Sequence, residues 1–448
     1  MSADAAVAGD RTQSRRGRAC ASSEGSKSSL PDIDTHILTR DAALRQRTAV
    51  VMPGVLFGHQ SVARVTRPLP DGYPQFMSRG RGAHIWDVDG NEYIDLMCSY
   101  GPVILGHQHP KVEAAVRTQA AKGDCQNGPS ARIVELAEAL VATVRHADWA
   151  MFAKNGCDAT TLALMIARAA TGRRKILVAR GSYHGSAPWC NPFPVGTTPE
   201  DRGNVIYFTY NDLESAQAAA AEAADDFAGV IVTPFRHDAP LDQELVDPSF
   251  ARGLRALCDA TGAALILDDV RCGFRLHLGG SWEPIGVDPD ISAWSKGIAN
   301  GYALAAVLGS DRFRTAASEV YATGSFWFAA VSMAAALATL KALAEERAVE
   351  TMQARGQALR TGLDEQARQW GIGIRQTGPA QMPFLNFDGD VDFAMANTFA
   401  GQAIRRGVYL HPRHNWFVSA AMTEEDVSRV LEATDEAFGA VRRLEGVE

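Results

Sequence analysis

The sequence predicts an α/β protein whose large domain is built on a mostly parallel, seven-stranded sheet, with a smaller α+β lobe beside it. Three observations lead to this prediction. From Trp149 onward, seven short β-rich runs alternate with helical stretches, as in parallel sheets covered on both faces. After Ala329 this pattern gives way to long helices rich in Ala, Leu and Glu. With 448 residues, 46% of them hydrophobic, the chain is long enough for two domains.

The elements are expected where hydrophobic runs end at turn residues. The strands of the sheet are predicted at Trp149–Phe152, Lys175–Ala179, Val205–Phe208, Gly229–Val232, Ala264–Leu267, Ile291–Trp294 and Ala303–Leu308. Helices are predicted between them at Ala159–Ala170, Asp212–Ala224 and Asp247–Thr261. Upstream, the stretch from Gly82 to Asp95 predicts two strands around an Asp-Gly-Asn turn. The apolar stretch from Phe326 to Leu340 contains Ser332 and ends at Lys341, which indicates a buried helix and not a membrane span.

Composition limits the partners and the compartment. Residues 1–40 contain no aromatic residue and are rich in Ser, Ala, Arg and Asp, so they are predicted to form a disordered tail. The net charge of −8, without a long basic run, argues against nucleic acid as the main partner. The seven cysteines include no C-x-x-C pair, a pattern that favours a reducing compartment. No secretory signal is visible, and we expect a cytoplasmic protein without a membrane partner.

Polar and glycine residues follow several predicted strands, where ligands of open α/β sheets gather. Gly156 and Cys157 would offer backbone N–H groups to an anion at a helix start, although Asp158 could equally form an ordinary helix cap. In Gly181-Ser-Tyr-His-Gly185, an aromatic ring could stack on a planar ligand or simply be half-buried in a loop. The segment Ala322–Trp327, which precedes another helix, is a second and weaker anion contact.

Two further segments carry charged residues at strand ends. Asp268 and Asp269 follow an apolar run, and a buried carboxylate there needs a cationic or hydrogen-bonding partner, such as a protonated pyridine nitrogen. Lys296 lies between a strand and a glycine-flanked turn, where it could form an imine with a carbonyl cofactor or remain a solvated lysine.

Together and in this order, these segments resemble the class III (ω-) aminotransferases of pyridoxal-5′-phosphate (PLP) fold type I. The resemblance runs from about Met52 to Thr423, and its most specific parts are Leu267–Arg275 and the lysine 28 residues after Asp268. It implies transfer of an amino group from an amine to a keto acid by a ping-pong, Lys Schiff-base mechanism. With this fold, residues 41–98 begin the small domain, 99–330 form the large PLP-binding domain, and 331–448 complete the small domain.

The resemblance also implies roles for individual residues. Lys296 corresponds to the lysine that binds PLP, and Asp268 to the carboxylate that keeps the pyridine nitrogen protonated. Val270 and Tyr183 correspond to the residues on either side of the ring, beside His184. Gly156 and Cys157 match the phosphate-binding pair, although Cys157 replaces a hydroxyl residue, so the backbone N–H groups alone could bind the phosphate. Ser325 matches a phosphate ligand that reaches across from a partner subunit, which implies a homodimer with shared active sites.

Five segments resemble one subgroup, the bacterial aminotransferases that degrade fumonisin: Val144–Phe152, Thr233–His237, Thr323–Phe328, Gln376–Pro383 and His411–Asn415. Those enzymes move the amine of hydrolysed fumonisin B1, a long-chain aminopolyol, to pyruvate. This implies a substrate pocket that includes Tyr100 and Trp327. Arg413 lies where several amine transaminases carry a mobile arginine, which would bind the carboxylate of the keto acid.

Two other functions compete with this interpretation. The first is a glutamate-1-semialdehyde 2,1-aminomutase of the same fold, but the segment from Pro53 to Gln60 lacks the arginine expected there, and the next one is Arg64. The second is a binding or regulatory protein without turnover, which the presence of Lys296 and Asp268 disfavours. His107/His109 and His411/His414 have metal-like spacing but no accompanying ligand set, so no metal is predicted.

Overall fold

The computed structural model describes residues 39–53, 69–193, 195–237 and 240–444. Most of the predicted tail, residues 1–38, lies outside this range, and Thr39 and Arg40 already belong to helix α1 (Thr39–Val51). In the part of the chain that is described, no helix combines the length and the apolar character that crossing a membrane requires.

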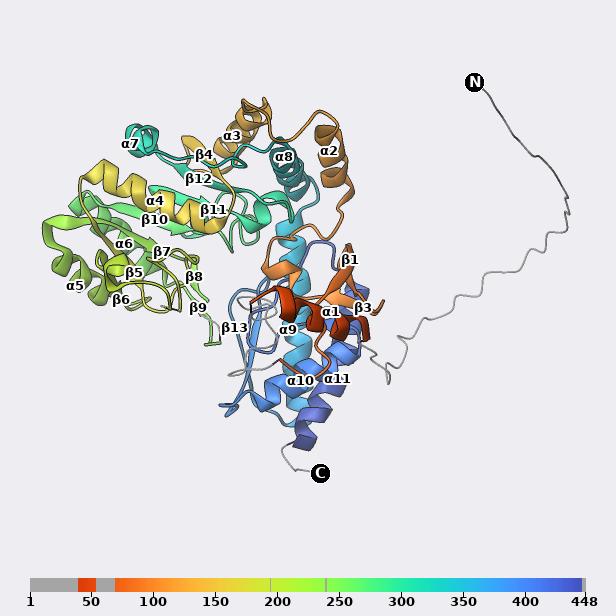
Figure 1. Ribbon diagram of the computed structural model, residues 1–448. Coiled ribbons are helices and arrows are strands. Elements are labelled where there is room, and N and C mark those ends of the chain that lie inside the picture. The colour runs from red at the N-terminus through yellow and green to blue at the C-terminus, as the bar shows by residue number, and fades with distance from the viewer. Residues whose placement is uncertain (1–38, 54–68, 194, 238–239, 445–448) are drawn as a thin grey trace, which may run out of the picture. The chain divides into compact units, whose positions relative to one another are not determined.

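The predicted seven-stranded sheet is confirmed, and its strand order is β4-β12-β11-β10-β7-β5-β6 (Figure 1). Its strands are β4 (Trp149–Ala153), β5 (Lys175–Ala179), β6 (Val205–Phe208), β7 (Phe227–Val232), β10 (Ala264–Asp268), β11 (Ile291–Trp294) and β12 (Ala305–Gly309). All neighbours pair in parallel except β12, which is antiparallel to both β11 and β4. Six strands therefore end at the same edge of the sheet.

Helices cover both faces of this sheet, which is why its strands are apolar throughout. Along β5, Ile176 and Val178 pack in one cluster with α4 (Gly156–Thr171), whereas Leu177 and Ala179 pack in another. The second cluster contains the buried faces of α5 (Leu213–Ala223) and α6 (Pro248–Thr261). This alternation follows from the two-residue period of a strand. α7 (Arg314–Glu319) adds to the α4 face.

A second sheet joins the two ends of the described chain. β1 (Met77–Arg81), β2 (His84–Asp87) and β3 (Glu92–Asp95) form an antiparallel meander, and the predicted Asp-Gly-Asn turn lies between β2 and β3. β15 (Val408–Tyr409) then pairs in parallel with β3. The remaining elements of this lobe are α9 (Ala348–Trp370), β13 (Ile374–Thr377), β14 (Phe384–Phe387), α10 (Ala394–Arg405) and α11 (Glu424–Leu444) (Figure 1). Residues from both ends of the described chain therefore share one sheet, and the division into a large and a small domain stays a prediction.

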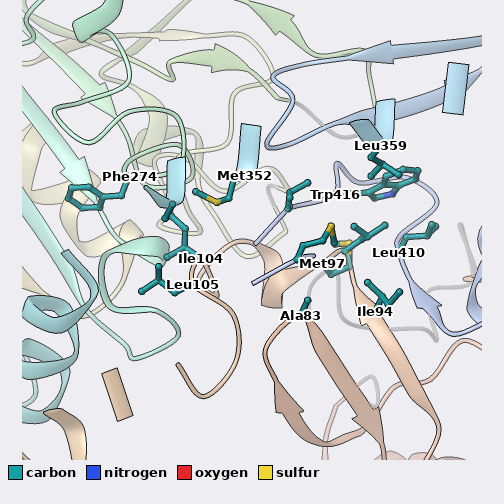
Figure 2. Close-up of a cluster of buried hydrophobic side chains, with 14 of the residues drawn as sticks. Ala83, Ile94, Met97, Ile104, Leu105, Phe274, Met352, Leu359, Leu410 and Trp416 are labelled. Atoms are coloured by element: carbon teal, nitrogen blue, oxygen red, sulfur yellow. The ribbon is translucent and has the colours of Figure 1, made fainter. Parts of the chain in front are cut away.

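Helix α8 (Ala330–Glu345) is buried, as predicted, and packs against α2 (Pro110–Ala120) and α3 (Arg132–Thr143). It therefore lies with the large sheet, although it follows the proposed boundary at residue 330. One hydrophobic cluster continues from Ile104 and Phe274 through Met352 of α9 to Trp416 (Figure 2). This shared core fixes one lobe against the other.

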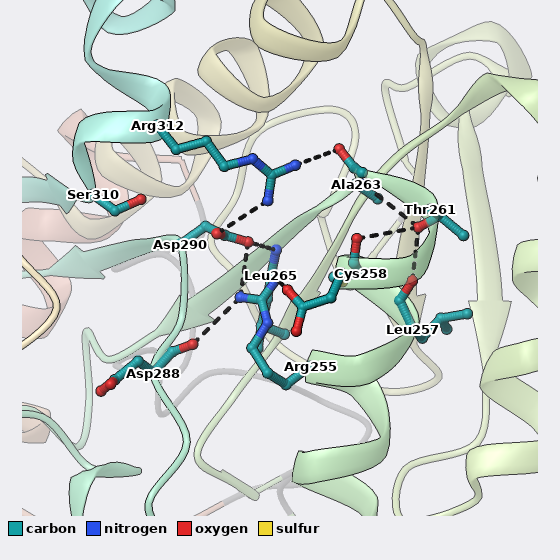
Figure 3. Close-up of polar contacts among 12 residues, drawn as sticks. Arg255, Leu257, Cys258, Thr261, Ala263, Leu265, Asp288, Asp290, Ser310 and Arg312 are labelled. Atoms are coloured by element: carbon teal, nitrogen blue, oxygen red, sulfur yellow. Dashed lines mark hydrogen bonds and ion pairs between the residues drawn. The ribbon is translucent and has the colours of Figure 1, made fainter.

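The edge of the sheet where β11 begins carries a structural polar cluster around Asp290 (Figure 3). The Asp290 carboxylate accepts the backbone N–H of Leu265 at 2.8 Å and pairs with Arg255 at 2.9 Å and Arg312 at 3.4 Å. These contacts tie α6 and the end of β12 to the start of β10. Lys296 follows the opposite end of β11, so the two polar groups occupy different edges of the sheet.

Candidate active site

A cavity of about 430 Å³ lies at the carboxyl edge of the large sheet, where the parallel strands end. Its lining comes chiefly from the loops that follow β4, β5, β10 and β11. Seven of the predicted site residues line it, namely Gly156, Cys157, Tyr183, His184, Asp268, Val270 and Lys296. These residues are far apart in sequence, and the parallel sheet brings them together because its loops share one edge.

Lys296 begins a short 3-10 turn, η6 (Lys296–Ala299), directly after β11. Its φ of 46° is in the left-handed region, which costs a non-glycine residue about 1–3 kcal/mol and is typical of functional sites. Burial, together with the nearby charge of Arg271, lowers the Lys296 pKa to about 7, and Asp268 only partly opposes this shift. The amine is therefore largely available as a nucleophile near neutral pH.

Asp268, the last residue of β10, is buried and accepts a hydrogen bond from His184, with 2.7 Å between Oδ2 and Nδ1. Its other oxygen accepts the backbone N–H of Val270 at 3.2 Å. Asp269 points elsewhere, because successive side chains of an extended chain alternate in direction. It accepts hydrogen bonds from Ser281, and burial raises its pKa to about 7. Only one of the two adjacent acids therefore faces the cavity.

The start of α4 forms a narrow polar wall of the cavity. A Cβ atom on Gly156 would lie 2.6 Å from Val270 Cγ1, and one on Gly185 would lie 2.7 Å from Cys157 Sγ. The Cys157 sulfur accepts the backbone N–H of Ala187 at 3.2 Å, and its hydrogen bond with the Cys190 thiol contributes most to lowering its pKa, to about 6. Small residues thus keep open a space beside the helix N-terminus, where the dipole favours an anion.

The other predicted site residues do not belong to the described lining of this cavity. Ser325 is exposed in the loop before α8. Trp327 packs against Gly324, where a Cβ would lie 2.3 Å from the indole nitrogen. The Tyr100 ring contacts His414 edge-on, with 5.2 Å between centroids. The Arg413 guanidinium donates to Asn397 Oδ1 at 3.0 Å.

Among the lining residues that were not predicted from the sequence are Arg271 and His237. Arg271 lies three residues after Asp268 and donates to Asn415 Oδ1 at 2.7 Å. His237 is buried, and desolvation, reinforced by the charge of Arg271, holds its pKa well below the usual range, so it is neutral. Both residues lie in segments quoted for the family resemblance, but nothing in their spacing indicated that their side chains would reach the cavity.

Histidines with metal-like spacing make other contacts. His107 pairs with Asp95 at 2.8 Å, and His109 pairs with Glu346 at 3.1 Å. His411 accepts the backbone N–H of Arg413 at 3.0 Å. Among the described residues, no group of three His, Cys, Asp or Glu side chains is placed to hold a metal ion.

The aminotransferase class-III family model matches residues 69–437 of this chain. The chain is a class III aminotransferase. It is 50% identical over 405 residues to the aminopentol aminotransferase of Sphingopyxis macrogoltabida, an alignment that covers 90% of this chain and 95% of that protein. Its structure is similar, with a TM-score of 0.89 and 49% identity, to that of the Sphingopyxis sp. MTA144 FumI protein in its PLP internal aldimine form. That match covers 92% of this chain and 98% of FumI.

The glutamate-1-semialdehyde 2,1-aminomutase of Desulforudis audaxviator is more distant, at 35% identity over 89% of this chain and 97% of that protein. The segment from Pro53 to Arg64, used above against the mutase, lies almost entirely outside the described residues.

Class III aminotransferases use PLP, and the cavity fits this group. PLP combines an aldehyde, a pyridine nitrogen and a phosphate. The cavity offers a buried lysine, a buried carboxylate and the N-terminus of a 16-residue helix, one for each of these groups. His184 adds a further polar group to the cavity wall. Its buried Nε2 has no hydrogen-bond partner among the described residues and could contact the cofactor.

Proposed function

We propose that this aminotransferase takes the amino group of a long-chain aminopolyol, such as hydrolysed fumonisin B1, and passes it to pyruvate in a second half-reaction. The observation that carries the proposal is the 50% identity to an aminopentol aminotransferase over nearly the whole length of both chains. Pockets are retained less faithfully than folds, so the substrate needs its own test. The scattered cysteines without a C-x-x-C pair support a cytoplasmic location.

Residues from four loops would hold the cofactor. The backbone N–H groups of Gly156 and Cys157 would bind its phosphate, because the Cys157 sulfur already interacts with Cys190 and Ala187. Val270 and Tyr183 would contact the two faces of the ring. Tyr183 is 39% exposed, so one face of its own ring is available. When bound, PLP supplies a conjugated ring that accepts the electrons released as a bond at the substrate Cα breaks.

Lys296 would act twice. Its amine, with a pKa lowered to about 7, attacks a carbonyl carbon while unprotonated. With cofactor and substrate bound, the same nitrogen would move the proton at the substrate Cα, first as a general base and then as a general acid. A pKa near the working pH suits both directions of this transfer.

Asp268 would hold a proton on the pyridine nitrogen. The Nδ1 of His184 donates to Asp268 Oδ2 and orients the carboxylate. The His184 ring lies 6.2 Å from that of Trp189 in a stacked arrangement, which holds the imidazole in place. Asp268 thus has its orientation set by a residue from a different loop, as a preorganised site requires.

A partner subunit would complete the site. Ser325 is exposed before α8, which makes its hydroxyl available to a phosphate in the partner's site in a homodimer. Tyr100 and Trp327 would contribute to the substrate pocket. Arg413 was assigned to the carboxylate of the keto acid, but its guanidinium is directed at Asn397 in this structure.

A half-reaction screen tests the proposal. Hydrolysed fumonisin B1 should bleach the absorbance of bound PLP, and pyruvate should restore it with formation of alanine. An aminopolyol that leaves the spectrum unchanged, while a simple amine bleaches it, would overturn the donor assignment. The aminomutase, supported by the 35% identical relative, is distinguished by omitting the acceptor, because a mutase converts glutamate-1-semialdehyde without added keto acid.

A further inference from the structure

An α-keto acid presents a distinctive problem to this site. Its carboxylate is bonded directly to the carbon that receives the amino group, so the cation that binds it must lie close to Lys296. Of the arginines that the structure describes, only Arg271 lines the cavity around Lys296. Arg236 pairs with Glu244 at 3.1 Å and lines a different cavity, together with Arg375.

The Arg271 side chain is positioned by the small domain. It starts in the turn after β10, and its Nη1 donates to Asn415 Oδ1 at 2.7 Å. Asn415 is buried, and its own Nδ2 donates to the backbone oxygen of Trp416 at 2.9 Å. This second bond fixes which side of the amide faces Arg271. A neutral amide orients the guanidinium and leaves its charge intact.

The charge of Arg271 lowers the pKa of side chains on three different segments. After burial, it is the next strongest influence that lowers the pKa of Lys296, of His237 and of His414. Asp268 acts on Lys296 in the opposite direction. The positive charge of Arg271 therefore acts at the Lys296 amine, beside which the substrate carbon would lie.

We infer that Arg271 binds the carboxylate of the keto-acid acceptor and that Asn415 is its positioning residue. A guanidinium can hold a carboxylate through two parallel N–H bonds, and it keeps its Asn415 contact when an uncharged aminopolyol occupies the site. The site would then accept a donor without a carboxylate and an acceptor with one, through a side chain that does not swing away. This inference rests on the proposed amine-to-keto-acid function and names the group that selects the acceptor.

The test separates the two half-reactions by stopped-flow absorbance in wild type, Arg271→Met, Arg271→Lys and Asn415→Ala. In Arg271→Met, the pyruvate concentration for half-maximal rate should rise about 10–100-fold, as expected for the loss of a charge-assisted bidentate contact. Bleaching by the amine should change by a clearly smaller factor than the pyruvate constant, because there Arg271 acts only through the pKa of Lys296. Arg271→Lys should recover part of the lost pyruvate affinity, because lysine restores the positive charge but cannot make two parallel hydrogen bonds to the carboxylate. Asn415→Ala should raise the same pyruvate constant by a smaller factor.

Propanal serves as an acceptor without a carboxylate, and Arg271→Met should slow it no more than it slows bleaching by the amine. Arg236→Met changes an arginine of a different cavity, and it is the matched control that should leave the pyruvate constant near wild type. The inference is overturned if both half-reactions slow equally, or if propanal is affected as strongly as pyruvate. If wild type rejects pyruvate but uses 2-oxoglutarate, the pyruvate proposal fails separately, and the same comparison with 2-oxoglutarate decides the role of Arg271.

Discussion

Replacing Lys296 with methionine should stabilise the cofactor-free protein while abolishing its activity. The lysine is largely enclosed by the wall of the cavity, and both desolvation and the charge of Arg271 oppose its protonation. The Asp268 carboxylate favours the protonated lysine, but its effect is smaller than the combined effect of desolvation and Arg271. A methionine of similar length fills the same space with an apolar side chain, so the folded protein no longer carries this electrostatic cost. A catalytic site commonly lowers stability in this way.

The magnitude follows from the pKa. An ordinary lysine titrates at 10.5, whereas Lys296 titrates at about 7 in the folded protein. Each tenfold change in proton affinity corresponds to about 1.4 kcal/mol, so the buried lysine costs roughly 4 kcal/mol of folding free energy at pH 7. Because the pKa of Lys296 is lower in the folded protein than in the unfolded chain, the full loss of folding free energy applies below pH 7. It decreases as the pH rises and vanishes near 10.5, where the unfolded chain also loses its proton.

The assay is urea unfolding of the PLP-stripped proteins at several pH values between 6 and 9. Protein concentration is held constant, because the stability of the proposed homodimer would depend on it. Lys341→Met removes an exposed lysine of α8 and is the matched control, expected within about 0.5 kcal/mol of wild type. A Lys296→Met protein that is less stable than wild type, or a difference that does not shrink with rising pH, would refute the reasoning.

Three other predictions concern the cofactor and the dimer. Asp268→Asn should retain bound PLP, measured by absorbance, but lower the single-turnover rate by about 2–4 orders of magnitude because the pyridine nitrogen loses its charged partner; an unchanged rate would contradict this role. Gly156→Ala should weaken PLP binding by about tenfold or more, since its Cβ would lie 2.6 Å from Val270, and adding Val270→Ala should recover most of the affinity. Mixing Lys296→Ala protomers with inactive Ser325→Glu protomers should restore activity, because some heterodimers then contain one intact site; no recovery after proven subunit exchange would mean that each chain builds its own site.

The sequence by itself determined the elements of the large domain and the identity of its reactive residues. All seven predicted strands form, because continuous apolar runs bounded by turn residues suit a sheet buried on both faces. The local pattern marked Lys296 and Asp268 as candidates, the resemblance to class III aminotransferases implied their roles, and both residues line the cavity. Each follows a parallel strand, and parallel strands bring their carboxyl ends to one edge. Local sequence is sufficient for such residues because the fold class fixes where strand ends lie.

Only the tertiary structure decided which side chains complete the site. The sequence placed two adjacent acids after β10, but packing directs Asp268 towards His184 and Asp269 towards Ser281. Arg271 donates to Asn415 across 144 positions of sequence, and that contact exists only because the segment after β15 packs beside the end of β10. Such contacts depend on the register and packing of distant segments. A local pattern determines a backbone element, whereas the direction in which a long side chain points depends on neighbours that the chain supplies from elsewhere.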